Sequence, residues 1–481
     1  MSKLIDRKAR AALTGVSLLA LTACATLGPN FAQPAAPDAP GYAMAGDRAA
    51  PGVALSPEAR TAGPWWLAFG SPELDAVVRQ ALAGSPTLAE ADATLARARA
   101  EARAQDAVGD PKVEGIASAQ RERINTQAFG FTGFPSPTIN LYSLGATVTY
   151  DLDLFGGQRR KSEAAKARAE AEARRADAAY LTLTGDVVMQ ALRIAVLRAQ
   201  IDAVQAMVAD DQRTIDMVRK AQQAGGQAPS AVTGGIAQQA QDEALLPPLQ
   251  RQLDAARHRL ALLVGKSPAQ WTAPNFAIAD FQAPGAVPVS LPSALVRQRP
   301  DILAAEAEFH AATADIGAAQ AARYPDIRLS AGLTQATIAP ENIFSRDSSG
   351  WNLMAGLIGP IVPSKQLKSR QRAAEAEALA AQARYNATVL RAFVQVSDVM
   401  SNLAGDQAAL AARTRAQNAA EATLRDERKA LELGGGTMLA VVDAQRQLNL
   451  ARRNTVAAQG QGLSDTAELF TATAADWRSP S

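Results

Sequence analysis

The sequence predicts a mainly α-helical protein with a smaller β portion, built as a tandem repeat of a short helix, a β-hairpin and long coiled-coil helices. Three observations support this fold class. A pattern of prolines occurs twice, apolar and polar residues alternate in short segments, and apolar residues recur every seven positions along two stretches that lack proline. An internal duplication of this size means that each motif belongs to one of two similar structural units.

Each repeat opens with a short helix. Pro86 and Pro300 each begin an alanine-rich helical segment, and Pro111 and Pro325 follow at the same spacing, each before an alternating segment. Proline suits the first position of a helix and disfavours helix in the residue before it. The first proline of each pair therefore predicts a helix start, and the second marks the change to extended chain.

Two strands follow each short helix, joined by a loop rich in glycine and proline. The clearest apolar positions are Leu144, Ala146, Val148 and Tyr150 in the first copy, and Ile327, Leu329, Ala331 and Leu333 in the second. Strict alternation places such residues on one face of a strand. The pattern is typical of outer-membrane barrels and also of soluble sandwiches. Four strands are too few to close a barrel, so a barrel would need several chains.

The longest helices are predicted from about 162 to 224 and from about 369 to 433. Their heptad positions include Val187, Ile194, Ile201 and Ile215 in the first helix, and Val389, Val396 and Leu403 in the second. A sustained seven-residue repeat indicates helices packed in a left-handed supercoil. Glycines at 225–226 and 434–436 predict tight turns, each followed by a single return helix, running to about 265 and 471.

The N-terminus has the order of an export signal: basic residues, an apolar run and a small-residue site that ends in Leu21-Thr22-Ala23-Cys24. This site resembles a bacterial lipobox, which predicts that residues 1–23 are a lipoprotein signal peptide and that Cys24 carries a covalent lipid. The alternative is an unmodified buried cysteine. Ala25 follows instead of the aspartate associated with inner-membrane retention, which implies the outer membrane.

Residues 24–64 form a lipidated arm rich in proline and alanine, which could hold the body away from the lipid, run along its surface or be a disordered tail. Signal cleavage removes a net charge of +3, so the formal charge of +2 becomes −1. A near-neutral chain gives no support to a nucleic-acid partner. After the signal we expect no apolar run close to the ~18 residues of a transmembrane helix, so a membrane crossing would require a closed β-barrel.

These features together resemble the TolC family of outer-membrane efflux proteins, in its lipoprotein branch. The resemblance is carried by Trp65-Trp66 with Phe69-Gly70-Ser71-Pro72-Glu73-Leu74, by YDLDLFG at 150–156, by RQRPDI at 297–302 and by LAVVDAQ at 439–445. It implies a homotrimer with a twelve-stranded barrel in the outer membrane and a twelve-helix tunnel in the periplasm. The structural repeats then cover 65–285 and 286–475, before a tail of 476–481.

The resemblance also implies a function. The protein would be a passive duct for drugs or other small toxic compounds, joined through a periplasmic adaptor to an inner-membrane pump of the resistance–nodulation–division type. Asp443 would lie at the narrow periplasmic aperture, although without the family it is more simply a solvated carboxylate near a helix start. Two positions depart from the family: Ala440 replaces a second aspartate, and Pro360 to Lys365 replaces an apolar-Phe-Asp-Gly-Gly stretch.

Two other functions are compatible with parts of the pattern: a type I secretion conduit for proteins, and a lipid-anchored periplasmic coiled-coil scaffold without a pore. The scaffold leaves the four strands unexplained. An enzyme is not expected, because the only histidines, His258 and His310, lie in helical segments without a second ligand. We therefore expect no metal and no cofactor beyond the lipid on Cys24. Arginines in RQRPDI are expected to brace the repeat junction by ion pairing.

Overall fold

The computed structural model describes residues 26–46, 53–56, 64–130, 132–284, 287–360 and 365–474. The predicted signal peptide and Cys24 lie outside these ranges. The chain divides into two compact units, each taking segments from both sequence repeats. The sheet unit comprises Met1–Gln33, Leu95–Glu172 and Ala305–Tyr385, and the coil unit comprises Pro34–Thr94, Ala173–Ala304 and Asn386–Ser481.

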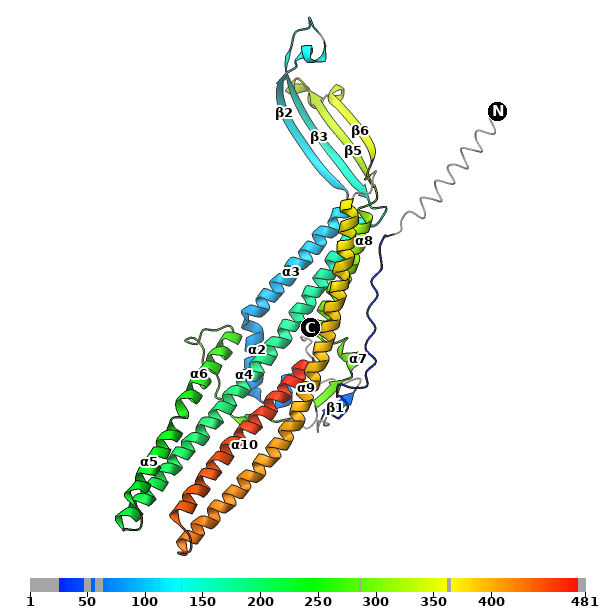
Figure 1. Ribbon diagram of the computed structural model, residues 1–481. Coiled ribbons are helices and arrows are strands. Elements are labelled where there is room, and N and C mark those ends of the chain that lie inside the picture. The colour runs from blue at the N-terminus through cyan, green and yellow to red at the C-terminus, as the bar shows by residue number, and fades with distance from the viewer. Residues whose placement is uncertain are drawn as a thin grey trace. The chain divides into compact units, whose positions relative to one another are not determined.

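The sheet unit contains the four predicted strands in one antiparallel sheet (Figure 1). They are β2 (Lys112–Arg123), β3 (Thr138–Leu152), β5 (Asp326–Thr337) and β6 (Ser349–Ile358). Their order is β2-β3-β5-β6, so the hairpins of the two repeats lie side by side and pair through β3 and β5. Short 3₁₀ turns occupy the connections at Ala107–Gly109, Thr126–Phe129, Pro340–Asn342 and Arg346–Ser348.

Four helices contribute to the sheet unit: most of α3 (Pro86–Asp106) and α8 (Pro300–Ala321), and the first turns of α4 (Gly157–Gln223) and α9 (Lys365–Glu432). Their contacts are made largely by alanine. One cluster joins Ala98 and Ala102 to Ala169, and another joins Ala312 to Ala378 and Ala381. Small side chains allow neighbouring helices to approach closely, which is why this sequence is rich in alanine.

The coil unit contains the remainder of α4 and α9, together with α5 (Pro229–Glu243), α6 (Leu246–Leu263) and α10 (Met438–Ala472). The heptad residues of α4 form its core, with Val187, Ile194 and Ile215 almost fully buried. The prediction of one return helix to about 265 was wrong. The chain breaks between Glu243 and Leu246, because the prolines that follow Leu246 suit a helix start and not a helix interior.

Several elements of the coil unit were not predicted. They are η1 (Trp65–Phe69), α2 (Pro72–Gly84), η4 (Ile278–Asp280), α7 (Pro292–Leu295), and the parallel pair of β1 (Val53–Ser56) and β4 (Val287–Ser290). The Trp65-Trp66 motif is an aromatic core: Trp65 stacks on Phe470 with 5.6 Å between ring centroids, and Phe69 meets Phe470 edge-on. Ser71 then caps α2 by accepting a hydrogen bond from the Leu74 amide at 3.3 Å.

One described helix, α4, has a stretch long and apolar enough to cross a membrane, against our expectation that no such stretch follows the signal. More than half of that stretch is buried within the protein, as in the core helix of a soluble protein. Its apolar character is therefore accounted for by the coiled-coil core, where it packs against other helices.

Candidate functional sites on the sheet and the helix ends

The sheet carries one continuous apolar face. Register places Val148 of β3 opposite Val113 of β2 and Ala331 of β5, and Ala331 lies opposite Leu353 of β6. Paired residues point to the same face of a sheet. All eight strand residues singled out from the sequence share this face: Leu144, Ala146, Val148, Tyr150, Ile327, Leu329, Ala331 and Leu333.

In the single chain this apolar face is open. Exposed large apolar residues occur on this face in all four strands: Val113 of β2, Val148 of β3, Leu333 of β5 and Trp351 of β6, the last 77% exposed. The opposite face is more polar in its middle, where Thr147 of β3 lies between Glu114 of β2 and Gly332 of β5, although Ile116, Met354 and Ile358 also lie on it. A large exposed apolar face marks contact with a membrane or a partner, and its alternation with a polar face is the pattern of outer-membrane strands.

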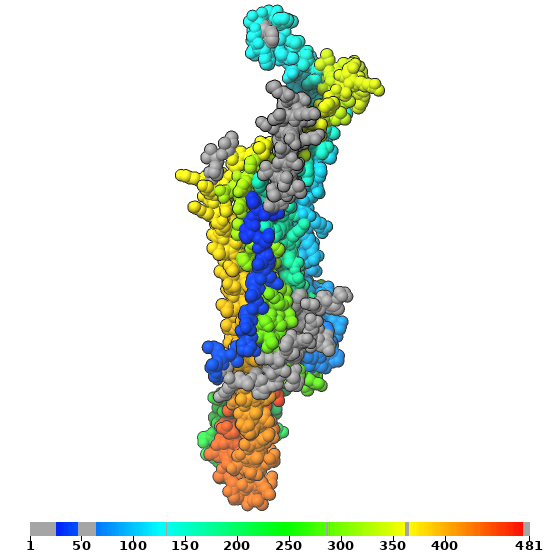
Figure 2. Space-filling model, turned by 90° about the vertical axis from the view of Figure 1, so that its right-hand side faces the viewer, coloured from blue at the N-terminus to red at the C-terminus, as the bar shows by residue number. Residues whose placement is uncertain are grey.

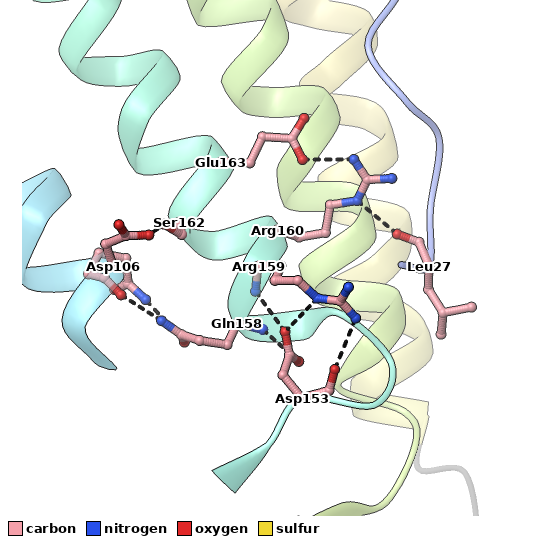
Figure 3. A network of polar contacts seen from close by, with 9 residues as sticks. Leu27, Asp106, Asp153, Gln158, Arg159, Arg160, Ser162 and Glu163 are labelled. Carbon is pink, nitrogen blue, oxygen red and sulfur yellow. Dashed lines mark hydrogen bonds and ion pairs between the residues drawn. The ribbon is translucent and has the colours of Figure 1, made fainter. Parts of the chain in front are cut away.

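A capped helix start lies directly below the sheet, where β3 gives way to α4 (Figure 3). The Asp153 carboxylate accepts hydrogen bonds from the amides of Gln158 at 3.0 Å and Arg159 at 2.8 Å. A carboxylate there satisfies free amides and complements the positive end of the helix dipole. The YDLDLFG motif thus supplies the anionic cap of α4. Beside it, Asp106 at the end of α3 accepts hydrogen bonds from Ser162 and from Lys166 at 2.8 Å.

The same helix start holds the N-terminal arm. The Arg160 guanidinium, only 3% exposed, donates to the carbonyls of Leu27 at 3.0 Å and Gly28 at 3.2 Å and pairs with Glu163 at 2.8 Å (Figure 3). The Leu27 amide in turn donates to the Phe155 carbonyl at 3.1 Å. Three backbone contacts therefore fix the arm to the base of the sheet, close in sequence to Cys24.

Within the sheet unit, aromatic side chains extend this attachment. Phe31 stacks on His310 with 4.4 Å between ring centroids and meets Phe309 edge-on at 5.5 Å. The His310 Nε2 lies 3.0 Å from a Glu163 oxygen. His310 is thus a contact residue between α8, α4 and the arm. In the coil unit Tyr42 donates to the Ser290 carbonyl at 2.7 Å. Figure 2 shows the described part of the arm in dark blue, and within each unit these contacts hold it against the protein surface.

The predicted aperture residue, Asp443, lies in the second turn of α10. This helix starts after Thr437, whose hydroxyl accepts a hydrogen bond from the Ala440 amide at 3.2 Å. The Asp443 side chain is 61% exposed and pairs weakly with Arg446 at 3.9 Å. It is therefore an accessible carboxylate near one end of the coil unit, and its place in an aperture stays a prediction.

A buried polar layer lies close to Asp443, and the sequence analysis did not anticipate it. The Gln445 amide, 5% exposed, donates to Asp210 of α4 at 2.7 Å and to Asn449 at 3.1 Å, and its oxygen accepts from Arg428 of α9 at 2.8 Å. Asp210 also pairs with Arg213. The one sequence signal for this layer is that Gln190 and Asp211 interrupt the apolar heptad pattern of α4. Such a layer fixes which helices pair, at some cost in stability.

Two carboxyl pairs are also buried in the coil unit. Burial, a hydrogen bond to Asp242 and the charge of Asp242 together raise the pKa of Asp211 to about 7. Arg446 lowers this pKa and Asp210 raises it further. Burial and a hydrogen bond to Asp465 likewise raise the pKa of Asp406 to about 7. In each pair the neighbouring carboxyl group disfavours the charged form, because two adjacent negative charges repel each other.

The RQRPDI motif has a bracing role, as the sequence analysis expected. Arg299 pairs with Asp301 at 2.7 Å and donates to Gln395 of α9 at 3.0 Å and to the Ala472 carbonyl at the end of α10 at 2.8 Å. One guanidinium thereby ties the start of α8 to two other helices. Across the described part of the chain, no group of three or more His, Cys, Asp or Glu residues is arranged to hold a metal ion.

Comparisons with known proteins agree with this geometry. The family model described as "Outer membrane efflux protein" matches residues 77–266 and 291–475. The pyoverdine export outer membrane protein OpmQ of Pseudomonas putida is 28% identical over 426 residues, covering 87% of this chain and 89% of OpmQ. The fusaric acid resistance protein FusA of Burkholderia cepacia is 31% identical over 380 residues, covering 76% and 69%. The solved structure of the outer-membrane channel OprN matches with a TM-score of 0.85 at 26% identity, covering 94% of this chain and 100% of that one.

Proposed function

This chain belongs to the outer membrane efflux protein family, and we propose that it is the duct of a tripartite efflux system for drugs or other small toxic compounds. Its place as an outer-membrane efflux channel follows from the family and from its structural match to such a channel. The duct would act passively, without a reaction of its own. An adaptor would connect it to an inner-membrane pump of the resistance–nodulation–division type, which would supply the energy for transport.

The open sheet is the observation that carries this proposal. Within the described residues, β2 and β6 each have one edge without a paired strand. An unpaired edge is a site for strand addition, and closure into a barrel removes it. Because the four strands alternate in direction, β6 of one copy can pair antiparallel with β2 of the next. A homotrimer then closes a twelve-stranded barrel, with the apolar face toward lipid and the polar face toward the pore.

The contacts of the N-terminal arm support the proposal that a lipid on Cys24 anchors the protein. Leu27, Gly28 and Asn30 are all held by Arg160 at the base of the sheet. Acyl chains on Cys24, three residues before Leu27, would enter the membrane beside the barrel that they help to anchor. One lipid chain alone binds membranes weakly, whereas a lipid next to a spanning barrel adds to an insertion that is already stable.

The substrate class is inferred from relatives. OpmQ is named for pyoverdine export and FusA for fusaric acid resistance, and both names refer to small compounds. These names favour small-molecule efflux over a type I conduit for proteins. Relatives with different cargo share this fold, so we expect the pump to select the cargo and the duct to pass it.

The test is single-channel current from the purified full chain in a planar bilayer. The wild type should give small, cation-preferring steps, because a ring of carboxylates in a narrow pore favours cations. Asp443→Asn should give larger steps or a weaker cation preference. Asp426→Asn, which removes an exposed carboxylate from α9, is the matched control and should behave as the wild type. Failure of the protein to insert in lipid would contradict the channel, and identical currents from all three proteins would move the constriction away from Asp443.

A further inference from the structure

The start of α9 carries an unusual concentration of positive charge. Four cations, Lys365, Lys368, Arg370 and Arg372, occupy its first two turns, and no acidic residue lies in the first turn. The N-terminus of a helix is the positive end of its dipole, so cations there are unfavourable and anions are favourable. Both the cations and the helix dipole at this end therefore favour the binding of an anion.

At the equivalent start of α4, carboxylates of the same chain supply negative charge. It also opens with cations, but the Asp153 carboxylate caps its amides, Arg159 bonds to Asp153, and Arg160 pairs with Glu163. The second repeat lacks this device, because the residues from Gly359 to Ser364 contain no aspartate or glutamate. The departure from the family's Asp-containing stretch thus removes the anionic cap from α9.

No substitute is found elsewhere in the described structure. All four side chains are exposed, and none forms a hydrogen bond or ion pair with a residue that the structure describes. The nearest acidic residues along α9 have other contacts: Glu375 accepts from Gln371 at 2.9 Å, and Glu377 pairs with Arg384 at 2.6 Å. The four cations are therefore available to an external anion.

The position of this cluster identifies the anion. The strand β6 ends at Ile358, and Leu357 and Ile358 are both largely exposed. Only six residues separate this apolar end of the sheet from Lys365. If the sheet spans the outer membrane, as proposed above, the cations lie where the periplasmic leaflet meets water, at the level of the phospholipid headgroups. Phosphate groups suit both the helix N-terminus and the basic side chains.

We propose that the first two turns of α9 bind the anionic headgroups of phospholipids in the periplasmic leaflet. This inference rests on the proposed membrane placement of the sheet. The lipid phosphate supplies the negative charge that Asp153 supplies to α4. A trimer would carry three such clusters around the base of its barrel.

The experiment measures the affinity of the full-length protein in detergent for a fluorescent phosphatidylglycerol, with phosphatidylcholine as the neutral reference. The variant is K365Q/K368Q/R370Q/R372Q. The control is R413Q/R415Q/R425Q/K429Q, which removes the same charge from exposed positions farther along the same helix. Each basic residue near an anionic surface is worth about fivefold in affinity. After allowance for screening, we expect the variant to lose at least ~tenfold for phosphatidylglycerol, with the control within ~twofold of wild type.

Three results would overturn the inference: equal affinity for the two lipids, an equal loss in the control, or displacement of phosphatidylglycerol by millimolar inorganic phosphate. A variant that dissociates into single chains in lipid-free detergent would also contradict it, since the cations would then pair with a neighbouring copy. Bilayer currents distinguish this inference from the proposed function. Normal currents without a phosphatidylglycerol preference reject the lipid cluster alone, whereas absence of insertion rejects the channel.

Discussion

Two adjacent glycines in α5, Gly234 and Gly235, should respond in opposite ways to the same substitution. Glycine inside a helix lowers stability by about 1 kcal/mol relative to alanine. A Cβ on Gly234 would meet nothing within 4 Å, so Gly234→Ala should recover about 0.5–1 kcal/mol. A Cβ on Gly235 would lie 2.9 Å from Cγ1 of Ile215, which is 2% exposed in the α4 core. Overpacking of this kind costs about 1–3 kcal/mol, so Gly235→Ala should be neutral or destabilising.

The two variants should therefore differ by about 1–3 kcal/mol, or roughly fivefold to more than a hundredfold in the opening equilibrium of α5. Amide hydrogen exchange of α5 peptides in the full chain measures this local equilibrium directly. Exchange should slow in Gly234→Ala and should stay unchanged or quicken in Gly235→Ala. In a double-mutant cycle, Ile215→Ala should remove the penalty of the added methyl group. Equal slowing in both variants would show that α5 does not depend on glycine to approach α4.

Three further perturbations test other parts of the argument. The pKa of Asp211 is raised in the folded protein, so its contribution to stability is best at acidic pH and falls as pH rises from about 4 towards about 7. Asp211→Asn should therefore flatten the fall in thermal unfolding temperature between pH 5 and pH 8, and an unchanged slope would show that the raised pKa of Asp211 does not cause this fall. Arg299→Ala removes the side-chain donor to the carbonyl of buried Ala472, so unfolding temperature should drop by an amount corresponding to about 1–3 kcal/mol, whereas a neutral result would show that the brace is dispensable. Phe31→Ala removes two ring contacts from the arm, so limited proteolysis should cut near residue 31 faster than in wild type. An unchanged rate would show that the contacts of Arg160 alone keep the arm attached.

Much of the fold was accessible from local patterns. The prolines placed the starts of α3 and α8, the alternation placed four strands, and the heptads placed two very long helices. These features depend on the spacing of apolar residues and on the backbone preferences of proline, and both can be identified in a single sequence. The break after Glu243 was also visible, since Pro247 and Pro248 follow it, but the alanine-rich pattern on both sides obscured it.

The missing features depend on contacts between distant segments. The pairing of β1 with β4 and the hold of Arg160 on Leu27 join residues that no periodicity relates. The polar layer around Gln445 required three helices to be in register before its partners could be named. Asp443 was singled out through family resemblance alone, because an exposed acid in an early helical turn looks ordinary. The aperture predicted for it would be formed together with neighbouring copies, which one chain does not contain.

The open sheet constrains the order in which this protein can be made. The coil unit has a helical core within one chain, since residues such as Val187 and Ile194 are fully buried there. The sheet is different, because no described residue of the same chain covers its apolar face or pairs with the outer edges of β2 and β6, and in the proposed barrel lipid and other copies would cover them. A chain that formed this sheet early in water would expose unpaired strand edges, which can pair with other chains and cause aggregation. We expect the helices to fold first in the periplasm and the barrel to close last, at the membrane, so that assembly and insertion are one event.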